Sequence, residues 1–317
     1  MAQRRLLLPA AALLLLSLLE GADGLRSNLL PGLLSHPLSA LQREAMSLAL
    51  FAVSATGVAW LLKAKLPAGR QLWIAAEIGI GLFAIPALLM HFSYSSTSGF
   101  TRSALMTLVP LLAVVLEPYF RNDAAQQPRS GLVAALVSLA GALFVFPVTI
   151  LGTVNAGIGF AAVVLAAISI SVANCGAVRA LALLPENSSV AMLPTAAIAA
   201  GAAALLLAIV ELSVERAPWT GEALAPQLLW SALIDLPALF LLFWLLRRLT
   251  AVQTAVRFIL APLLVILTGA FAMQQPMQLE TWLGLLLMVA GACWLLVGGM
   301  EAGHELLSIG SPPDGEP

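Results

Sequence analysis

The sequence predicts an all-α integral membrane protein with ten transmembrane helices, arranged as two inverted five-helix repeats. Three observations support this: the composition, the lengths of the apolar runs, and three internal sequence matches about 150 residues apart. Of the 317 residues, 61% are hydrophobic and only 10% are charged, whereas soluble domains average about 25% charged residues. A soluble chain of this composition would lack the polar side chains to cover its core, so the composition predicts residence in a lipid bilayer.

Ten apolar runs are candidates for spanning helices. A spanning helix needs about 20 mostly apolar residues at a rise of about 1.5 Å each. The candidate runs are 6–20, 45–62, 71–91, 98–117, 131–149, 156–180, 190–211, 226–246, 251–271 and 281–299. These runs are continuous, whereas the strands of a membrane barrel alternate between apolar and polar residues, so a barrel is excluded.

Lys and Arg between the runs orient the predicted helices, because cytoplasmic loops are enriched in these residues. With the N-terminus inside, the cytoplasmic side collects Arg4, Arg5, Lys63, Lys65, Arg70, Arg121, Arg129, Arg179, Arg247 and Arg248. The outer side receives only Arg26, Arg43 and Arg216. The sequence therefore predicts cytoplasmic N- and C-termini, and a location in the bacterial cytoplasmic (inner) membrane.

The two ends of the chain need separate interpretations. Residues 1–24 have a basic start, an apolar stretch and small residues near the end, which is also the pattern of a secretory signal peptide. Retention as helix 1 and removal, which leaves nine helices in the same orientation, are both compatible with the sequence. Residues 301–317 end in the Pro- and Gly-rich, acidic SIGSPPDGEP, which predicts a disordered cytoplasmic tail.

Three pairs of similar segments indicate an internal repeat. They are LMTLVPLLAVVLEPYF (105–120) with RFILAPLLVILTGAFA (257–272), SLAGALFVF (138–146) with MVAGACWLL (288–296), and AIPALLM (84–90) with DLPALFL (235–241). A unit with an odd number of helices places its second copy upside down in the membrane. Inverted repeats of this kind are typical of secondary transporters, whose binding site lies near the midplane where the repeats meet. We therefore expect one repeat in 1–150 and the other in 151–300.

The segment LLRRLTAVQTAVRFILAPLLVILTGAFAMQQPMQLETWLGLLLMVAGACWLL (245–296) resembles the EamA-like branch of the drug/metabolite transporter superfamily. In that family a small loop with Ser, Thr or Ala leads into a helix with a central proline, and a tight turn precedes a Gly-bearing final helix. The resemblance covers roughly 40–150 and 156–298. It implies a ten-helix transporter in which helices 3, 4, 8 and 9 are among those lining a central cavity. Gln274-Gln275-Pro276 stands where the family often has Gly-Glu-Pro.

Four ionisable residues lie inside apolar runs and are candidates for substrate binding or coupling: Glu77, Arg102, Asp235 and Arg257. A charge at the centre of a membrane helix costs about 2.5–3.5 kcal/mol on insertion scales, so such residues usually face the bundle interior or a wet cavity. Matching their depths along the predicted helices pairs Glu77 with Arg257, and Arg102 with Asp235. Extension of Glu77 and Arg102 to the interface, or purely structural pairing, are the alternatives.

Uncharged residues inside the runs provide further candidates. Pro110, Pro262, Pro86 and Pro237 remove a backbone donor and bend their helices, so we expect hinge or cavity-shaping roles, with simple packing as the alternative. Asn174 lies in the middle of its run. It is predicted to form a hydrogen bond between helices and is a further cavity candidate.

A polar connection, with Tyr94 and the run SSTSGFT (95–101), separates the third and fourth predicted helices. Its Ser and Thr side chains fit either a helix cap or a contact with substrate, and the helix cap is the favoured interpretation.

No motif indicates a catalytic residue, a metal or a cofactor. The three histidines are scattered, the two cysteines have no metal-ligand spacing, and no Walker-type phosphate loop is present. The sequence, together with the family resemblance, predicts a secondary transporter, not an enzyme. It would export or exchange a small polar or amphipathic metabolite, such as an amino acid, by alternating access. Proton coupling, exchange and facilitated diffusion are all compatible with it, as is a homo-oligomer, while nothing indicates nucleic acid. The alternatives are a membrane enzyme acting on a lipid-linked substrate, and a non-transporting scaffold or sensor.

Overall fold

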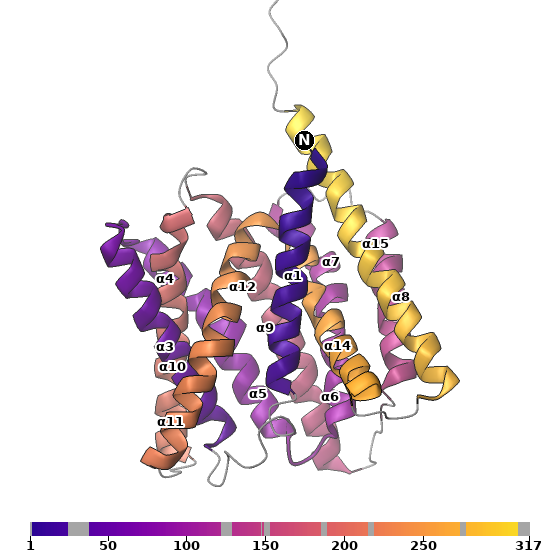
Figure 1. Ribbon diagram of the computed structural model, residues 1–317, viewed down its shortest axis with the longest axis horizontal. Helices are drawn as coiled ribbons and strands as arrows, with labels where there is room; N and C mark the ends of the chain where they lie inside the picture. Colours follow the sequence, from indigo (N-terminus) through magenta and orange to yellow (C-terminus); the bar gives the residue numbers. More distant parts are fainter. Residues whose placement is uncertain are drawn as a thin grey trace, which may run out of the picture.

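The computed structural model describes residues 2–24, 38–121, 129–146, 148, 153–184, 189–214, 219–272 and 277–309. Its regular secondary structure over these ranges is entirely helical (Figure 1). Eight of the helices are long and apolar enough to cross a membrane, and a shorter apolar helix covers Ser130–Val145. The expectation of an α-helical membrane protein is confirmed at this level.

The helices of the first half include two broken pairs. They are α1 (Ala2–Gly24), α3 (Ala40–Leu61), α4 (Arg70–Gly79), the π-helix η1 (Ile80–Ala84), α5 (Ile85–Ser93), α6 (Gly99–Met106), α7 (Leu108–Arg121) and α8 (Arg129–Val145). The segments α4, η1 and α5 follow one another without a gap, and Thr107 alone separates α6 from α7.

The second half repeats this order. Its elements are α9 (Val154–Ala182), the short 3₁₀ turn η2 (Ser189–Ala191), α10 (Met192–Val214), α11 (Gly221–Trp230), the π-helix η3 (Ser231–Asp235), α12 (Leu236–Arg248), α13 (Ala251–Ala255), α14 (Arg257–Ala272) and α15 (Leu279–Ile309). Again a π-helix joins two α-helices without a gap, and one residue, Val256, separates the next pair.

Each predicted apolar run coincides with one helix or one broken pair, with ends that differ by a few residues. The main difference lies at the C-terminus, where α15 continues to Ile309. The part of the predicted disordered tail between 301 and 309 is therefore helical, and that part of the prediction is wrong. The stretch contains Ala302, Glu305 and Leu306, which are good helix formers, and the first proline comes only at Pro312. Residues 310–317 lie outside the described part of the chain.

Both π-helices end just before a proline, and the missing N–H explains them. A proline cannot donate to the carbonyl four residues earlier, and its ring clashes with that carbonyl. A wider turn relieves the clash: the Ile85 N–H bonds the Ile80 carbonyl in front of Pro86. In front of Pro237, the Leu236 N–H bonds the Ser231 carbonyl in the same way. π-bulges of this kind occur frequently at functional sites.

Side chains of Ser, Thr and Gln fix several helix starts. Ser39 and Gln42 form a reciprocal capping box at the start of α3, and Thr250 and Gln253 form one at the start of α13. At α6, the Ser98 hydroxyl accepts from the Thr101 N–H at 3.1 Å. The predicted cap of this helix by its Ser- and Thr-rich run is confirmed.

The packing of the helices relates the two halves. The helix α9, which opens the second half of the chain, packs against α5 and α7 of the first half (Figure 1). In a similar way α1, of the first half, packs against α12 and α14 of the second half. α3 packs against α10, and α8 packs against α15, so each of these contacts joins a helix of the first half to one of the second. The N-terminal end of α1 lies at the same end of the bundle as the C-terminal end of α15 (Figure 1).

Glycines allow α8 and α15 to approach closely. A Cβ on Gly141 would lie 2.6 Å from the Gly284 carbonyl oxygen, and one on Gly291 would lie 2.6 Å from the Ala134 carbonyl oxygen. Close backbone contact through small residues is a common way for membrane helices to associate, because lipid leaves little hydrophobic force between them.

Candidate functional site

A cavity of about 290 Å³ lies between helices of both halves. In the first half, the lining comes from the end of α1, from the start of α3, and from η1 and α5. In the second half it comes from α11 and η3. The lining residues are Asp23, Ala40, Leu41, Arg43, Glu44, Ser47, Leu82, Phe83, Pro86, Ala87, Met90, Tyr94, Gln227 and Asp235. Because it includes the last turn of α1, the cavity lies toward the end of the bundle opposite the N-terminal end of that helix (Figure 1).

A hydrogen-bond network holds Asp235 at the wall of the cavity. The Ser47 hydroxyl donates to Asp235 Oδ2 at 2.6 Å, and Ser47 Oγ and Ser231 Oγ lie 2.8 Å apart. Gln227 Nε2 donates to Ser231 Oγ at 2.8 Å. Ser47, Ser231 and Gln227 are each at most 7% exposed, so their positions are determined by packing, and they orient the half-buried carboxylate.

The helix breaks place these groups. Ser231 and Asp235 are the first and last residues of the π-helix η3, and Gln227 lies one turn earlier on α11. A π-turn carries more residues per turn than an α-helix, so η3 rotates the positions around it relative to a regular helix. The wide turn forced by Pro237 therefore contributes to the placement of Asp235 beside α3.

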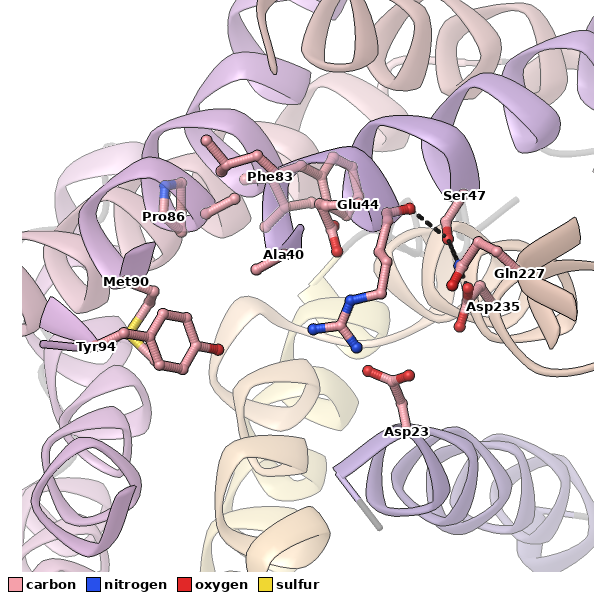
Figure 2. Close-up of a pocket in the computed structure, with 14 residues that line it drawn as sticks. Asp23, Ala40, Glu44, Ser47, Phe83, Pro86, Met90, Tyr94, Gln227 and Asp235 are labelled. Carbon is pink, nitrogen blue, oxygen red and sulfur yellow. Dashed lines mark hydrogen bonds between the residues drawn. The ribbon is translucent and has the colours of Figure 1, made fainter. Parts of the chain in front are cut away.

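The opposite side of the cavity is apolar. Figure 2 shows Pro86, Met90 and Tyr94 at one side, away from Ser47, Gln227 and Asp235. Phe83, from η1, belongs to the lining and is 9% exposed. The cavity thus has a polar side with carboxyl groups and a mostly apolar side, on which the Tyr94 hydroxyl is a polar group.

Arg257 lies outside this cavity and forms an ion pair with Glu20 of α1. The Arg257 side chain is 7% exposed and that of Glu20 is 28% exposed. The guanidinium also lies 4.5 Å from the centre of the Phe258 ring. The predicted pairing of Arg257 with Glu77 is wrong: α14 packs beside α1, whereas α4 packs against α10 and α9. Glu77 is exposed on the surface of the bundle.

Arg102 interacts within its own segment. Its Nη1 donates to the Thr97 carbonyl at 2.7 Å, and the guanidinium lies 4.2 Å from the centre of the Tyr94 ring. The predicted pair of Arg102 with Asp235 is wrong as well. Equal depth did not imply contact, because α6 packs against α7, α8 and α9, whereas η3 packs against α1, α3, α11 and α12.

Asn174 is fully buried in α9, and neither its Nδ2 nor its Oδ1 has a hydrogen-bond partner among the described residues. The predicted bond between helices is therefore not formed. Two serines of the same helix form such bonds instead: Ser169 Oγ donates to the Gly81 carbonyl at 2.7 Å, and Ser171 Oγ lies 3.2 Å from the Val109 carbonyl oxygen.

The four predicted prolines lie at or near the helix breaks. Pro86 is buried in the cavity wall, and Pro237 is half-buried directly after η3. Pro110 is buried, three residues beyond the break at Thr107, while Pro262 lies inside α14. Of the four, Pro86 alone is in the described lining of the cavity, and the hinge role of all four stays a prediction.

Sequence reasoning missed most of the polar lining. The sequence places Asp23 at the end of the signal-like segment and Arg43 on the outer side. Glu44 lies just before the apolar run 45–62 and is not among the predicted site residues. In the structure α3 begins at Ala40, so Arg43 and Glu44 lie within its first two turns. The capping box of Ser39 and Gln42, a Ser followed three residues later by Gln, could have indicated this earlier start.

Among the described residues, no group of three or more His, Cys, Asp or Glu side chains is placed to hold a metal ion. Cys175 is buried and Cys293 is exposed, and both are free. The arrangement can bind a small molecule through carboxyl, amide and hydroxyl groups, with apolar contacts on the other side.

Comparison with known proteins informs the fold alone. The structure is similar to a solved crystal structure, described only as that of a protein, with a TM-score of 0.69 and 17% sequence identity. The match covers 90% of this chain and 97% of the other. In all, 28 chains of solved structures match. No family model matches the sequence, and a search of curated proteins finds no relative.

Proposed function

We propose that the chain is a secondary transporter of the drug/metabolite type, with ten membrane spans in two inverted five-helix repeats. It moves a small polar or amphipathic metabolite, such as an amino acid or a related compound, by alternating access. The observation that carries the proposal is the cavity between the two halves. Asp23, Glu44 and Phe83 reach it from the first half, and Gln227 and Asp235 reach it from the second.

The equivalence of the halves supports the inverted repeat. The π-helices η1 and η3 begin about 150 residues apart, and the single-residue breaks at Thr107 and Val256 have nearly the same spacing. The packing of α9 against α5 and α7 corresponds to that of α1 against α12 and α14. A site formed where two such units meet is a general feature of transporters built from repeats.

Charge distribution supports the orientation. Lys63, Lys65 and Arg70 connect α3 to α4, and Arg247 and Arg248 end α12. An excess of Lys and Arg marks the cytoplasmic side of a membrane protein. We therefore propose that both termini are cytoplasmic, and that the cavity lies toward the outer side of a bacterial inner membrane.

A flux assay tests the proposal. Purified protein is reconstituted into vesicles, and uptake and counterflow are measured for amino acids, amines, carboxylates and sugars. We expect saturable transport of at least one class, reduced by Asp235→Asn and unchanged by Glu77→Gln. Glu77 is a matched control, because it is an intramembrane acid on the exposed surface of α4. Absence of transport for every class, with a lipid-modifying activity instead, would assign the chain to membrane enzymes.

Alternating access has its own test. A cysteine replaces Ala40 at the cavity in a Cys293→Ser background, since Cys293 is the exposed native thiol. A membrane-impermeant maleimide is applied from either side of oriented vesicles. A transporter should be labelled from one side in excess over the other, and substrate should change that ratio. Labelling from one side only, unaffected by any solute, would indicate a static scaffold or sensor.

A further inference from the structure

Pro86 leaves a carbonyl of η1 without a donor from its own helix, and a serine of another helix supplies one. The Ile85 N–H bonds the Ile80 carbonyl, so in the same π-register the Gly81 carbonyl would accept from residue 86, which as a proline has no N–H. The Ser169 hydroxyl of α9 donates to this Gly81 carbonyl at 2.7 Å. Within a membrane, Ser and Thr side chains of this kind compensate for the hydrogen bond that a proline removes. Ser169 therefore stabilises η1 as a π-turn.

The corresponding carbonyl of η3 has no such donor. The Leu236 N–H bonds the Ser231 carbonyl, so the Ala232 carbonyl would accept from residue 237, which is again a proline. Within the described part of the chain, no side chain donates to the Ala232 carbonyl. The backbone of η3 can therefore leave its π-turn without losing a bond from another helix at this carbonyl.

The helices beside the two π-helices explain this difference. α9 packs against η1, and α1 packs against η3. At the spacing that relates Pro86 to Pro237, Ser169 of α9 corresponds to Leu18 of α1. Leu18 is 50% exposed, and a leucine side chain has no hydrogen-bond donor. α1 thus takes the place beside η3 that α9 takes beside η1, without the hydroxyl that would bond its backbone.

Other helices bond η3 through side chains of the cavity wall. Ser47 of α3 bonds Ser231 and Asp235, the two ends of η3, at 2.8 and 2.6 Å. One residue before η3, Trp230 Nε1 donates to Asp23 of α1 at 3.0 Å. Ser47 and Asp23 both line the cavity, whereas the α9 serine that bonds η1 lies outside its described lining. A solute that enters the cavity can compete for these bonds to η3 but not for the bond that holds η1.

We propose that Ser169 is a positioning residue that fixes η1, and with it Phe83, while η3 is the wall that changes its turn when solute enters or leaves the cavity. Phe83 lies within η1 and packs against Phe243, with ring centroids 6.2 Å apart. η3 instead carries Asp235, whose direction depends on the number of residues per turn. This inference deepens the proposed transport function and rests on it for the passage of solute.

Hydrogen–deuterium exchange of the full-length protein in lipid nanodiscs, with no solute added, tests how each π-helix is held. Ser169→Ala should raise the exchange rate of the η1 amides by about 5-fold, the effect of one net hydrogen bond on a local opening equilibrium, and leave η3 unchanged. Ser47→Ala should accelerate η3 and leave η1 unchanged. Ser169→Thr keeps the hydroxyl and should retain wild-type exchange. Ser138→Ala is the matched control, because Ser138 is a buried serine whose hydroxyl bonds a carbonyl of its own helix.

A variant that adds the missing bond tests the motion of η3. Leu18→Ser gives α1 the hydroxyl that α9 has, and it should slow exchange of the η3 amides by about 5-fold. Leu14→Ser, one turn earlier on α1 and equally exposed, should not. In the flux assay Leu18→Ser should lower the maximal rate by about 5-fold, because it holds the wall that has to move. Ser169→Ala should instead weaken the apparent affinity several-fold at a nearly unchanged maximal rate.

Each part of the inference can be refuted. Unchanged exchange of η1 in folded Ser169→Ala protein, or equal acceleration throughout the chain, would refute the role of Ser169. Unchanged exchange of η3 in the Leu18→Ser variant would refute an open carbonyl in η3. Slower exchange of η3 in that variant with a wild-type maximal rate would show that η3 is not the moving wall.

The exchange assay and the flux assay fail separately. The expected exchange pattern without transport of any solute would refute the proposed function and leave the role of Ser169 in fixing η1 standing. Transport by a protein whose two π-helices do not respond to these variants would leave the proposed function standing and refute this inference.

Discussion

The two halves share their helix breaks but place different residues at them. The π-helix η3 ends in Asp235, and α14 begins with Arg257 directly after the break at Val256. In the first half, η1 ends in Ala84, and α7 begins with Leu108 directly after the break at Thr107. The backbone geometry is repeated, whereas the charges belong to the second half alone at these positions.

This difference separates two requirements of a binding cavity. Helix breaks occur in both halves, as π-helices before Pro86 and Pro237 and as one-residue interruptions at Thr107 and Val256. The polar groups differ between the two π-helices: η3 contributes Asp235 to the cavity wall, whereas η1 contributes the apolar Leu82 and Phe83. Of the four predicted ionisable candidates, Asp235 alone is in the described lining of the cavity, since Glu77 is exposed, Arg102 interacts within its own segment and Arg257 pairs with Glu20.

Removing the charge at the second break should have the largest effect. Arg257→Gln leaves Glu20 without its cation in a mostly buried site, and we expect a loss of about 3–5 kcal/mol in the free energy of unfolding. The double variant Glu20→Gln with Arg257→Gln should recover much of this loss, because no uncompensated charge remains. Unfolding in mixed detergent micelles measures both. Equal destabilisation by the single and double variants would mean that the pair is not coupled.

Transplanting the acid of η3 into η1 should have the next largest effect. Ala84 is completely buried, so Ala84→Asp should destabilise the fold by about 2.5–3.5 kcal/mol, the insertion cost of a charge. The reverse change, Asp235→Ala, should cost less stability but abolish substrate binding. The same unfolding assay compares the two. A well-tolerated Ala84→Asp would show that the first half also provides a polar environment.

The prolines test whether the shared geometry serves the cavity. Pro86→Ala and Pro237→Ala each restore a backbone donor, so stability should be unchanged or rise by about 1 kcal/mol. Transport should nevertheless fall several-fold, because relaxation of the π-turn displaces Phe83 or Asp235. Flux assays and thermal unfolding distinguish the two effects. Loss of stability in step with loss of transport would indicate simple packing.

The smallest effect should come from Ser47, which serves only the polar wall. Ser47→Ala removes the 2.6 Å hydrogen bond to Asp235, worth about 1 kcal/mol and thus about 5-fold in apparent affinity. The maximal rate should stay near that of the wild type. Concentration series of the transported solute measure the two quantities. A change in the maximal rate alone would contradict a positioning role.

Local features of the fold could be predicted from the sequence. Run length and hydropathy located the helices to within a few residues except at the C-terminal end of α15, because these properties depend on neighbouring residues. The prolines Pro86 and Pro237 indicated local irregularities but not that these are π-helices. Lateral packing could not be predicted from depth. Many helices place a residue at the depth of Arg257, and only the arrangement of α1 beside α14 selects Glu20.

The site itself was predicted only in part. Asp235 and Pro86 were among the candidates and do line the cavity. Arg43 and Glu44 were not, because hydropathy places the start of the span at 45, after the charged first turn of α3. The cavity includes residues at a helix start that a hydropathy profile assigns to a loop.

The Glu20–Arg257 pair has a consequence for synthesis of the chain. Its partners are 237 residues apart, and at about 5–20 residues per second the ribosome needs roughly 12–47 s to make the second after the first. Throughout that interval α1 has already been made without α14, so its Glu20 has no cation from that helix. α1 is thus made well before its neighbours α12 and α14, so late packing of α1 is a step at which the membrane insertion machinery would have to hold an unpaired charge.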